Sequence, residues 1–155
     1  MVGWPSGDGL GGCDGSAGVN LVKDMREKIG ALHEAMKPME QIEIPIEHHF
    51  CEGVYARKMT MPKDSTVVGK IHLHSQINIL SKGRVSVATD KGVIEMSAGD
   101  HIVCAKGSRR AFYAHEESVW TVILRCEETD IEKIEQEFVV ETEQQYLEFQ
   151  KRIAA

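Results

Sequence analysis

Between residues 41 and 124 the chain is a succession of short runs rich in β-branched and aromatic residues, and this pattern limits the fold more than any other feature. The runs read IEIPI, FCEGVYARKMTM, TVVGKIHLHSQINIL, RVSVAT, GVIEM, HIVCA, RAFYA and SVWTVIL. Turn-forming residues separate them, as at Lys82-Gly83 and Asp90-Lys91-Gly92. Many short strands at this spacing favour an all-β sandwich or barrel over alternating strands and helices, and we expect this β-rich domain to cover residues 41–126.

The segment before these runs differs from them in composition. Residues 1–19 hold seven of the chain's 14 glycines, which predicts a flexible, glycine-rich lead-in because glycine loses much backbone entropy on ordering. Over residues 20–38 apolar side chains recur at spacings of three and four, which is the period of an amphipathic helix. We therefore expect one N-terminal helix, capped by Asn20 and ended by Pro38.

The last segment, residues 127–155, carries the whole formal net charge of −6, because it has nine acidic and three basic residues while the rest of the chain is balanced. Its apolar residues return to the helical period and predict one or two C-terminal helices. Thr129 and Thr142 are each followed three residues later by Glu or Gln, a pattern typical of a helix N-terminal cap. We expect the acidic side chains to lie outside, and the acidity of this segment gives no information about a site elsewhere.

Composition also excludes several classes of partner. The pI near 5.6 and the lack of a basic stretch with aromatic residues argue against nucleic acid. No apolar run approaches the roughly 18–20 residues of a membrane-spanning helix, so no membrane partner is expected. The four cysteines form no CxxC pair, and no secretory signal precedes Lys23, which together predict reduced thiols in a cytoplasmic protein.

The segment 70–80 holds the candidate chemistry. Alternate residues of a strand share a face, and the polar residues at alternate positions here are His72, His74, Gln76 and Asn78. Two imidazoles spaced in this way lie about 7 Å apart at Cα and can converge on one transition-metal ion. The same alternation allows the opposite orientation, in which the isoleucines of the other face fill the core and both histidines lie in water.

Residues 61–124 resemble a small single-domain cupin of the RmlC-like superfamily. The first cupin motif is a His-x-His pair followed by a strand and a glycine turn, matched by His72-Leu73-His74 and Gly83. The second is a Gly-Asp run, matched between Gly99 and Arg110. The resemblance implies a jelly-roll or double-stranded β-helix barrel and a homodimer or higher homo-oligomer. The apolar residues of the N-terminal helix and of IEIPI are candidates for the contact between subunits.

The resemblance also implies a set of metal ligands, which this chain matches only in part. Cupins use the two histidines, a glutamate further along the same strand and a histidine that ends the second motif. The last two positions fall on Gln76 and Arg110 here, and the proline of the second motif is Ala105, so the metal site is degenerate. A guanidinium cannot ligate a metal and repels a dication, but it pairs well with a carboxylate or a phosphate.

The first functional hypothesis is a metal-binding cupin with a small-molecule ligand in the barrel. His72, His74 and Gln76 would bind a divalent transition metal (Fe, Mn, Ni or Zn). His115 or a carboxylate would complete the shell, although on a regular strand His115 falls on the opposite face from Arg110 unless a bulge intervenes. The intact His-x-His pair favours this hypothesis slightly, and the sequence leaves enzymatic activity open.

The second hypothesis is a metal-free cupin. Arg110 and the two histidines would hold an anionic small molecule such as a sugar phosphate or an organic acid, with Asn78 as a further ligand-binding residue. A bound anion would raise the histidines' affinity for protons. In a variant of this hypothesis the chain has no ligand and serves as a structural or assembly domain.

Overall fold

The structure is a computed structural model that describes residues 15–155, with side chains from Lys23 onward. Its strands are β1 (Ile46–Cys51), β2 (Val54–Met61), β3 (Thr66–Val68), β4 (Ile71–His72), β5 (Gln76–Lys82), β6 (Arg84–Thr89), β7 (Gly92–Ser97), β8 (His101–Cys104), β9 (Ala111–Ala114), β10 (Ser118–Arg125) and β11 (Val139–Val140). Its helices are α1 (Gly15–Met36), α2 (Ile131–Phe138) and α3 (Glu143–Ala154).

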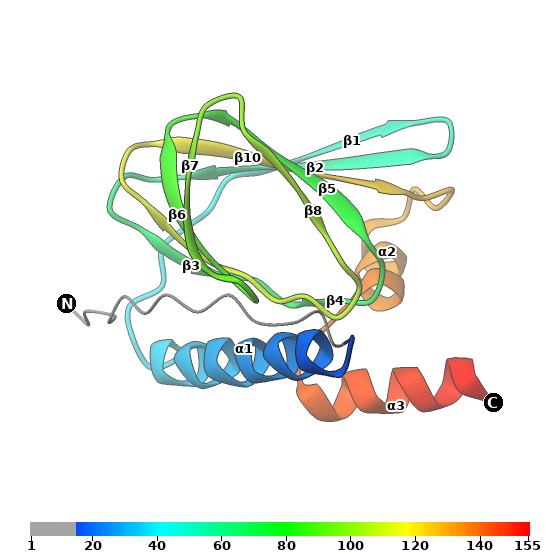
Figure 1. Ribbon diagram of the computed structural model, residues 1–155. Helices are drawn as coiled ribbons and strands as arrows, with labels where there is room; N and C mark the ends of the chain where they lie inside the picture. Colours follow the sequence, from blue (N-terminus) through cyan, green and yellow to red (C-terminus); the bar gives the residue numbers. More distant parts are fainter. Residues whose placement is uncertain (1–14) are drawn as a thin grey trace.

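Most of the strands form two antiparallel sheets that face each other and enclose the barrel (Figure 1). One sheet has the order β1-β2-β10-β5-β8 and the other β3-β9-β6-β7. Apart from the edge strand β1, the strands pair in nested fashion as β2 with β10, β3 with β9, β5 with β8 and β6 with β7. This nesting of first strand with last is the jelly-roll arrangement, to which cupins belong. It confirms the all-β barrel predicted from the sequence.

The chain crosses from one sheet to the other at the predicted Lys82-Gly83 turn, between β5 and β6. Gly83 has φ +86°, and a Cβ atom there would lie 2.6 Å from the carbonyl oxygen of Glu117 and 2.8 Å from Cα of Ser118. Both the positive φ and the close backbone require glycine at this position. Both the backbone conformation of Gly83 and the close packing around it therefore determine this turn.

The N-terminal helix is present, but its predicted limits are wrong. Helix α1 runs from Gly15 to Met36, so Asn20 lies within it instead of capping it. Of the predicted lead-in, residues 15–19 are helical and residues 1–14 lie outside the described residues. Extending an established helix adds a backbone hydrogen bond per residue, which offsets the entropy cost of the glycines. No helix in the described part of the chain is long and apolar enough to cross a membrane.

Two helices follow the barrel, as predicted, and their caps can be compared with the sequence patterns. At α3 the Thr142 side chain accepts from the Gln145 backbone, and the Gln145 side chain reaches back to the Thr142 backbone, which confirms the capping box. At α2 the cap is Asp130 and not Thr129, because the Asp130 carboxylate accepts from the backbone of Glu132 and Lys133. Either residue type can cap a helix, so the pattern left the position uncertain by one residue.

Helices α1 and α3 lie together beneath one side of the barrel, and α2 lies beside its end (Figure 1). The guanidinium of Arg26 on α1 is held by both carboxylate oxygens of Glu143 at 2.7 and 2.8 Å. It also donates to the carbonyl of Gly107 and stacks over the ring of Tyr146. One buried arginine thus fastens both helices to a barrel loop.

The main core lies between the two sheets. Its fully buried side chains are Met61, Leu80, Val85, Val87, Met96, Phe112, Ala114 and Trp120. Trp120 packs edge-on against Phe112 at a ring-centre distance of 4.7 Å, which confirms the core role expected for it. Two smaller clusters join the helices to the barrel, one around Ile134 of α2 and one around Tyr146 of α3.

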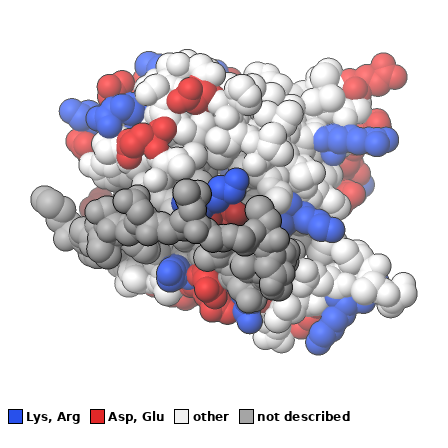
Figure 2. Space-filling view, viewed as in Figure 1, with Lys and Arg blue, Asp and Glu red and all other residues white. Residues whose placement is uncertain are grey.

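On the face shown in Figure 2, Lys and Arg are interspersed with Asp and Glu in small groups. Outside the part that grey atoms cover, that face has no large area of one sign. A further group of charged side chains, Arg57, Lys70 and Arg110, lines a cavity of the barrel instead.

Candidate functional site

A cavity of about 180 Å³ lies between the two sheets, at the end that β4 and β11 close. Its apolar wall comes from both sheets and comprises Met59, Val67, Val68, Phe112, Trp120 and Val122. Its polar lining comprises Arg57, Lys70, His72, Gln76, Asn78 and Arg110. The volume is comparable with the ~150 Å³ of an engineered cavity that binds benzene. An apolar pocket with a few convergent polar groups is the usual form of a small-molecule site.

His72 lies in this cavity because of the orientation of β4. Its neighbours Ile71 and Leu73 are buried on the other side, against Tyr146 of α3. Burial, with a smaller contribution from the charges of Arg57 and Arg110, lowers the pKa of His72 to about 4. The imidazole is therefore neutral at pH 7. Of the two orientations that the sequence allowed, His72 takes the inward one, and the apolar residues beside it are covered by helices.

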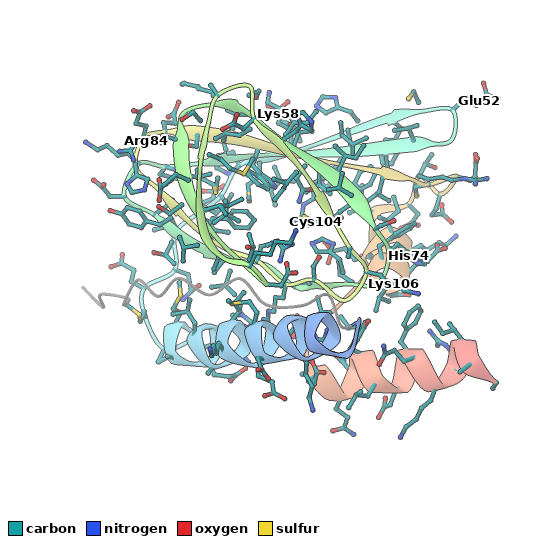
Figure 3. The ribbon with its side chains drawn as sticks, viewed as in Figure 1. Glu52, Lys58, His74, Arg84, Cys104 and Lys106 are labelled. Carbon is teal, nitrogen blue, oxygen red and sulfur yellow. The ribbon has the colours of Figure 1, made fainter. Side chains whose placement is uncertain are left out.

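His74, expected on the same face as His72, does not reach the cavity. The strand ends at His72 and the chain bends over residues 73–75, so the alternation that would align the two side chains is broken. The exposed ring of His74 packs against Phe138 and Phe149 at ring-centre distances of 5.0 and 6.1 Å. Figure 3 shows it at the edge of the barrel beside α2, away from Cys104 within the ring of strands. The structure thus separates the His-x-His pair.

Gln76 and Asn78 both face the barrel interior from β5 and line the cavity. The Asn78 amide nitrogen donates to the sulfur of Cys104 at 2.9 Å. Its carbonyl oxygen Oδ1 is buried without a hydrogen-bond partner. Burial raises the pKa of the Cys104 thiol, and the nearby Arg110 charge offsets this only in part, so the sulfur is protonated at neutral pH. The contact between Asn78 and Cys104 therefore leaves one buried hydrogen-bond acceptor, Asn78 Oδ1, without a donor.

Arg110 enters the cavity from the other sheet, just before β9. It is 8% exposed, and its Nη1 lies 3.4 Å from Oδ1 of Asp90. Its Nε is buried without a partner. The arginine that replaces the last cupin ligand histidine therefore lines the same cavity as Asn78, and each of the two residues has one buried polar atom without a partner.

The mouth of the cavity contains two further cations that the sequence analysis did not single out. Lys70 Nζ lies 2.8 Å from Glu135 Oε2, and Arg57 Nη1 lies 3.3 Å from Glu135 Oε1. Arg57 could have been found from the sequence, because it alternates on β2 with the inward-facing Tyr55 and Met59. Glu135 belongs to the acidic C-terminal segment, which the sequence analysis did not connect with the candidate site.

His115, expected as an additional ligand, lies outside the barrel. It follows β9, and its Nε2 is 2.6 Å from the Ser86 hydroxyl and 3.4 Å from a carboxylate oxygen of Glu95. Its ring also contacts Tyr113 edge-on. Because no bulge reverses the strand parity in β9, it stays on the face opposite Arg110. The structure brings His72, Gln76, Asn78 and Arg110 together and leaves His74 and His115 apart.

The side chains around the cavity do not fit a divalent transition metal. They offer a single imidazole, two amides and a protonated thiol, together with three cationic side chains. Metal ligation by cysteine needs the thiolate, and a cation opposes the binding of another cation. Within residues 15–155 no three His, Cys, Asp or Glu side chains are grouped so that they could hold a metal ion.

Comparison with known proteins gives structural similarity only. No family model matches the chain, and no curated protein matches its sequence. Among solved structures it is similar to KdgF from Halomonas sp., with 17% identity over 59% of this chain and 86% of that one and a TM-score of 0.49.

Two further structures are similar at the same level. They are an RmlC-like cupin from Shewanella frigidimarina (20% identity, 56% and 86% coverage, TM-score 0.46) and the EutQ protein of Clostridium difficile (17%, 56% and 70%, 0.46). The assignment of this chain to the jelly-roll fold rests on its own strand pairing.

Proposed function

We propose that this chain binds a small organic carboxylate with an apolar body in the barrel cavity, without a metal ion. The observation that carries the proposal is the buried guanidinium of Arg110, which lines the cavity and whose Nε has no partner; Asn78 Oδ1 is a second unpartnered atom in the lining. Leaving such groups unpaired costs about 1–3 kcal/mol each, and most buried polar groups in folded proteins have partners. A carboxylate that accepts from Arg110 Nε would recover the first of these costs, whereas Asn78 Oδ1 needs a donor that a carboxylate does not supply.

The chemistry of the ligand follows from the rest of the lining. The carboxylate would face the guanidinium of Arg110, with which it can form a charge-assisted hydrogen bond. The apolar wall around Phe112 and Trp120 suits a short aliphatic chain or a single ring and disfavours the hydroxyl groups of a sugar phosphate. Of the two kinds of anion suggested by the sequence, a sugar phosphate and an organic acid, the lining favours the organic acid.

His72 couples the binding of an anion to the uptake of a proton. It is neutral in the ligand-free cavity because burial lowers its pKa to about 4. A carboxylate beside it would favour the charged imidazolium and raise that pKa. The affinity for a carboxylate is therefore expected to rise as the pH falls from 8 toward 5.

The test is calorimetric titration of the protein with benzoate and butyrate, and with their neutral amides benzamide and butyramide. We expect the carboxylates to bind and the amides to bind at least about tenfold more weakly, because only the carboxylates carry the charge that Arg110 recognises. The variant Arg110→Met should lose the preference. The matched control Arg84→Met removes an exposed arginine outside the cavity and should leave it unchanged.

Two results would overturn the proposal. One is the absence of carboxylate binding to folded wild-type protein. The other is carboxylate binding that disappears when the protein is treated with EDTA and returns with Mn²⁺, Ni²⁺ or Zn²⁺, which would favour the metal hypothesis. Circular dichroism of Arg110→Met would show that the variant is folded, and Asn78→Leu gives an independent variant of the same cavity.

A further inference from the structure

The ion pairs at the cavity mouth place a fixed carboxylate beside the proposed ligand. Glu135 of α2 contacts Lys70 at 2.8 Å and Arg57 at 3.3 Å, and both of these cations line the ligand cavity. Lys70 also lies 3.7 Å from a carboxylate oxygen of Glu141. The two cations nearest the mouth are therefore already matched by acidic side chains of the protein itself.

Glu135 is half-buried and ionised at neutral pH. Burial raises its pKa, but the hydrogen bond from Lys70 and the charges of Lys70 and Arg57 outweigh that effect, so the pKa lies below its ordinary value. The glutamate is thus a permanent negative charge under physiological conditions. The neighbouring Ile134 is buried in the cluster beneath α2, which fixes the position of this helix turn on the barrel.

The position of Glu135 relative to the ligand cavity is defined by a shared wall. A second, smaller cavity of about 40 Å³ is lined by Glu135 and shares Arg57, His72, Val122 and Val139 with the ligand cavity. The carboxylate of Glu135 is therefore separated from a ligand in the larger cavity by the side chains that line both cavities. One of these side chains is Arg57, whose guanidinium Glu135 contacts. Arg57 can neutralise Glu135 or a second ligand charge, but not both fully.

We propose that Glu135 makes the cavity selective for singly charged over doubly charged carboxylates. Arg57 and Lys70 are paired with Glu135. Arg110, although Asp90 lies 3.4 Å from its Nη1, is the cation of the lining with an unpartnered donor. A second carboxylate directed toward the mouth would compete with Glu135 for its cations and be repelled by it. This inference rests on the proposed function, since it specifies which anions the same cavity accepts.

The test compares butyrate with succinate, which have the same number of carbon atoms and differ by one carboxylate. In wild-type protein, calorimetric titration at pH 7.5 should give tighter binding of butyrate. The variant Glu135→Gln keeps the size of the side chain, frees Arg57 and leaves Lys70 with only the more distant Glu141. The ratio of succinate to butyrate affinity should therefore rise at least about tenfold, an effect equal to about 1.4 kcal/mol.

Two further variants test whether the effect depends on the charge of Glu135 itself or on any charge at the surface of α2. Glu135→Asp retains the charge and should keep the wild-type preference, with the thermal midpoint of each variant showing that it is folded. Glu132→Gln removes an exposed charge from the same helix and should leave the affinity ratio within about twofold of wild type.

The outcomes distinguish the two proposals. If wild-type protein binds butyrate but Glu135→Gln leaves the affinity ratio unchanged, the role of Glu135 is refuted and the ligand cavity stands. If the ratio changes equally in Glu132→Gln, the effect is a general surface charge and the role of Glu135 is again refuted. If wild-type protein binds none of butyrate, succinate and benzoate, the proposed function itself fails.

Discussion

Two adjacent arginines, Arg109 and Arg110, are both buried and yet make contacts of different kinds. Arg109 turns toward the helices and donates to the carbonyls of Gly69 and Glu141 at 2.8 and 3.2 Å, with His33 Nδ1 2.9 Å from its Nη2. Arg110 turns into the cavity, has an acidic neighbour at 3.4 Å and leaves its Nε unpaired. Neighbouring residues of an extended segment point to opposite sides, and here those sides are a packed interface and a cavity.

The difference distinguishes a structural arginine from a ligand-binding one. Hydrogen bonds within the chain match the donors of Arg109 and hold α1 and the C-terminal segment to the barrel, although burial lowers the pKa of this arginine. Arg110 has one acidic neighbour, Asp90, and leaves a buried donor without a partner. A protein can keep such a group where binding a partner compensates for it.

The largest effect should come from comparing the stability of Arg109→Met with that of Arg110→Met. Removing Arg109 leaves two backbone carbonyls without their donor, and should lower the free energy of unfolding by about 3 kcal/mol. Removing Arg110 deletes an incompletely paired charge and should change it by less than about 1 kcal/mol, in either direction. Urea denaturation at pH 7 measures both, and equal losses in the two variants would remove the distinction.

The next effect concerns His72, whose pKa of about 4 in the folded protein lies below the 6.5 of an unperturbed histidine. Between these values the unfolded chain binds more protons than the folded one, so stability rises with pH across this window and falls on acidification. At pH 5 the loss from His72 alone amounts to about 2 kcal/mol, at 1.36 kcal/mol per pKa unit.

This loss is measured as a difference between wild type and His72→Gln, because the carboxylates titrate similarly in both proteins. Urea denaturation at pH 7 and pH 5 should show wild type losing about 2 kcal/mol more than the variant. Identical losses would mean that the imidazole is solvated and not in the cavity. Saturating benzoate should reduce the wild-type loss, since a bound anion stabilises the imidazolium.

The smallest effects should come from the histidines that the structure leaves outside the cavity. His74→Gln and His115→Gln should each change the free energy of unfolding by less than about 1 kcal/mol, as surface substitutions usually do. Neither should alter benzoate affinity by more than about twofold in calorimetric titration. A loss of binding in His74→Gln would indicate that the His-x-His pair acts as a unit after all.

Much of the fold could be predicted from the sequence, because period-two alternation and glycine turns are local signals. The strands, the turn at Gly83 and the cap at Thr142 all depend on residues within a few positions of each other. The inward direction of Arg110 also follows from the alternation of side chains along an extended segment. Arg110 directly precedes β9, and its neighbour Arg109 points away from the barrel interior.

The separation of His72 from His74 could not be read from local sequence. The backbone nitrogen of Leu73 donates to the carbonyl of Phe138, and β4 pairs with β11, so a segment far along the chain sets where the strand ends. Glu135 is a similar case, because on its own helix it resembles any solvated carboxylate. Only the packing of α2 against the barrel brings it to Lys70.

The most direct test of the central claim is a crystal structure of the protein with benzoate. We expect the benzoate ring to pack against Phe112 and Trp120, with a carboxylate oxygen about 2.8 Å from Nε of Arg110. A benzoate found only on the outer surface, or a metal ion held by His72 in the cavity, would contradict it.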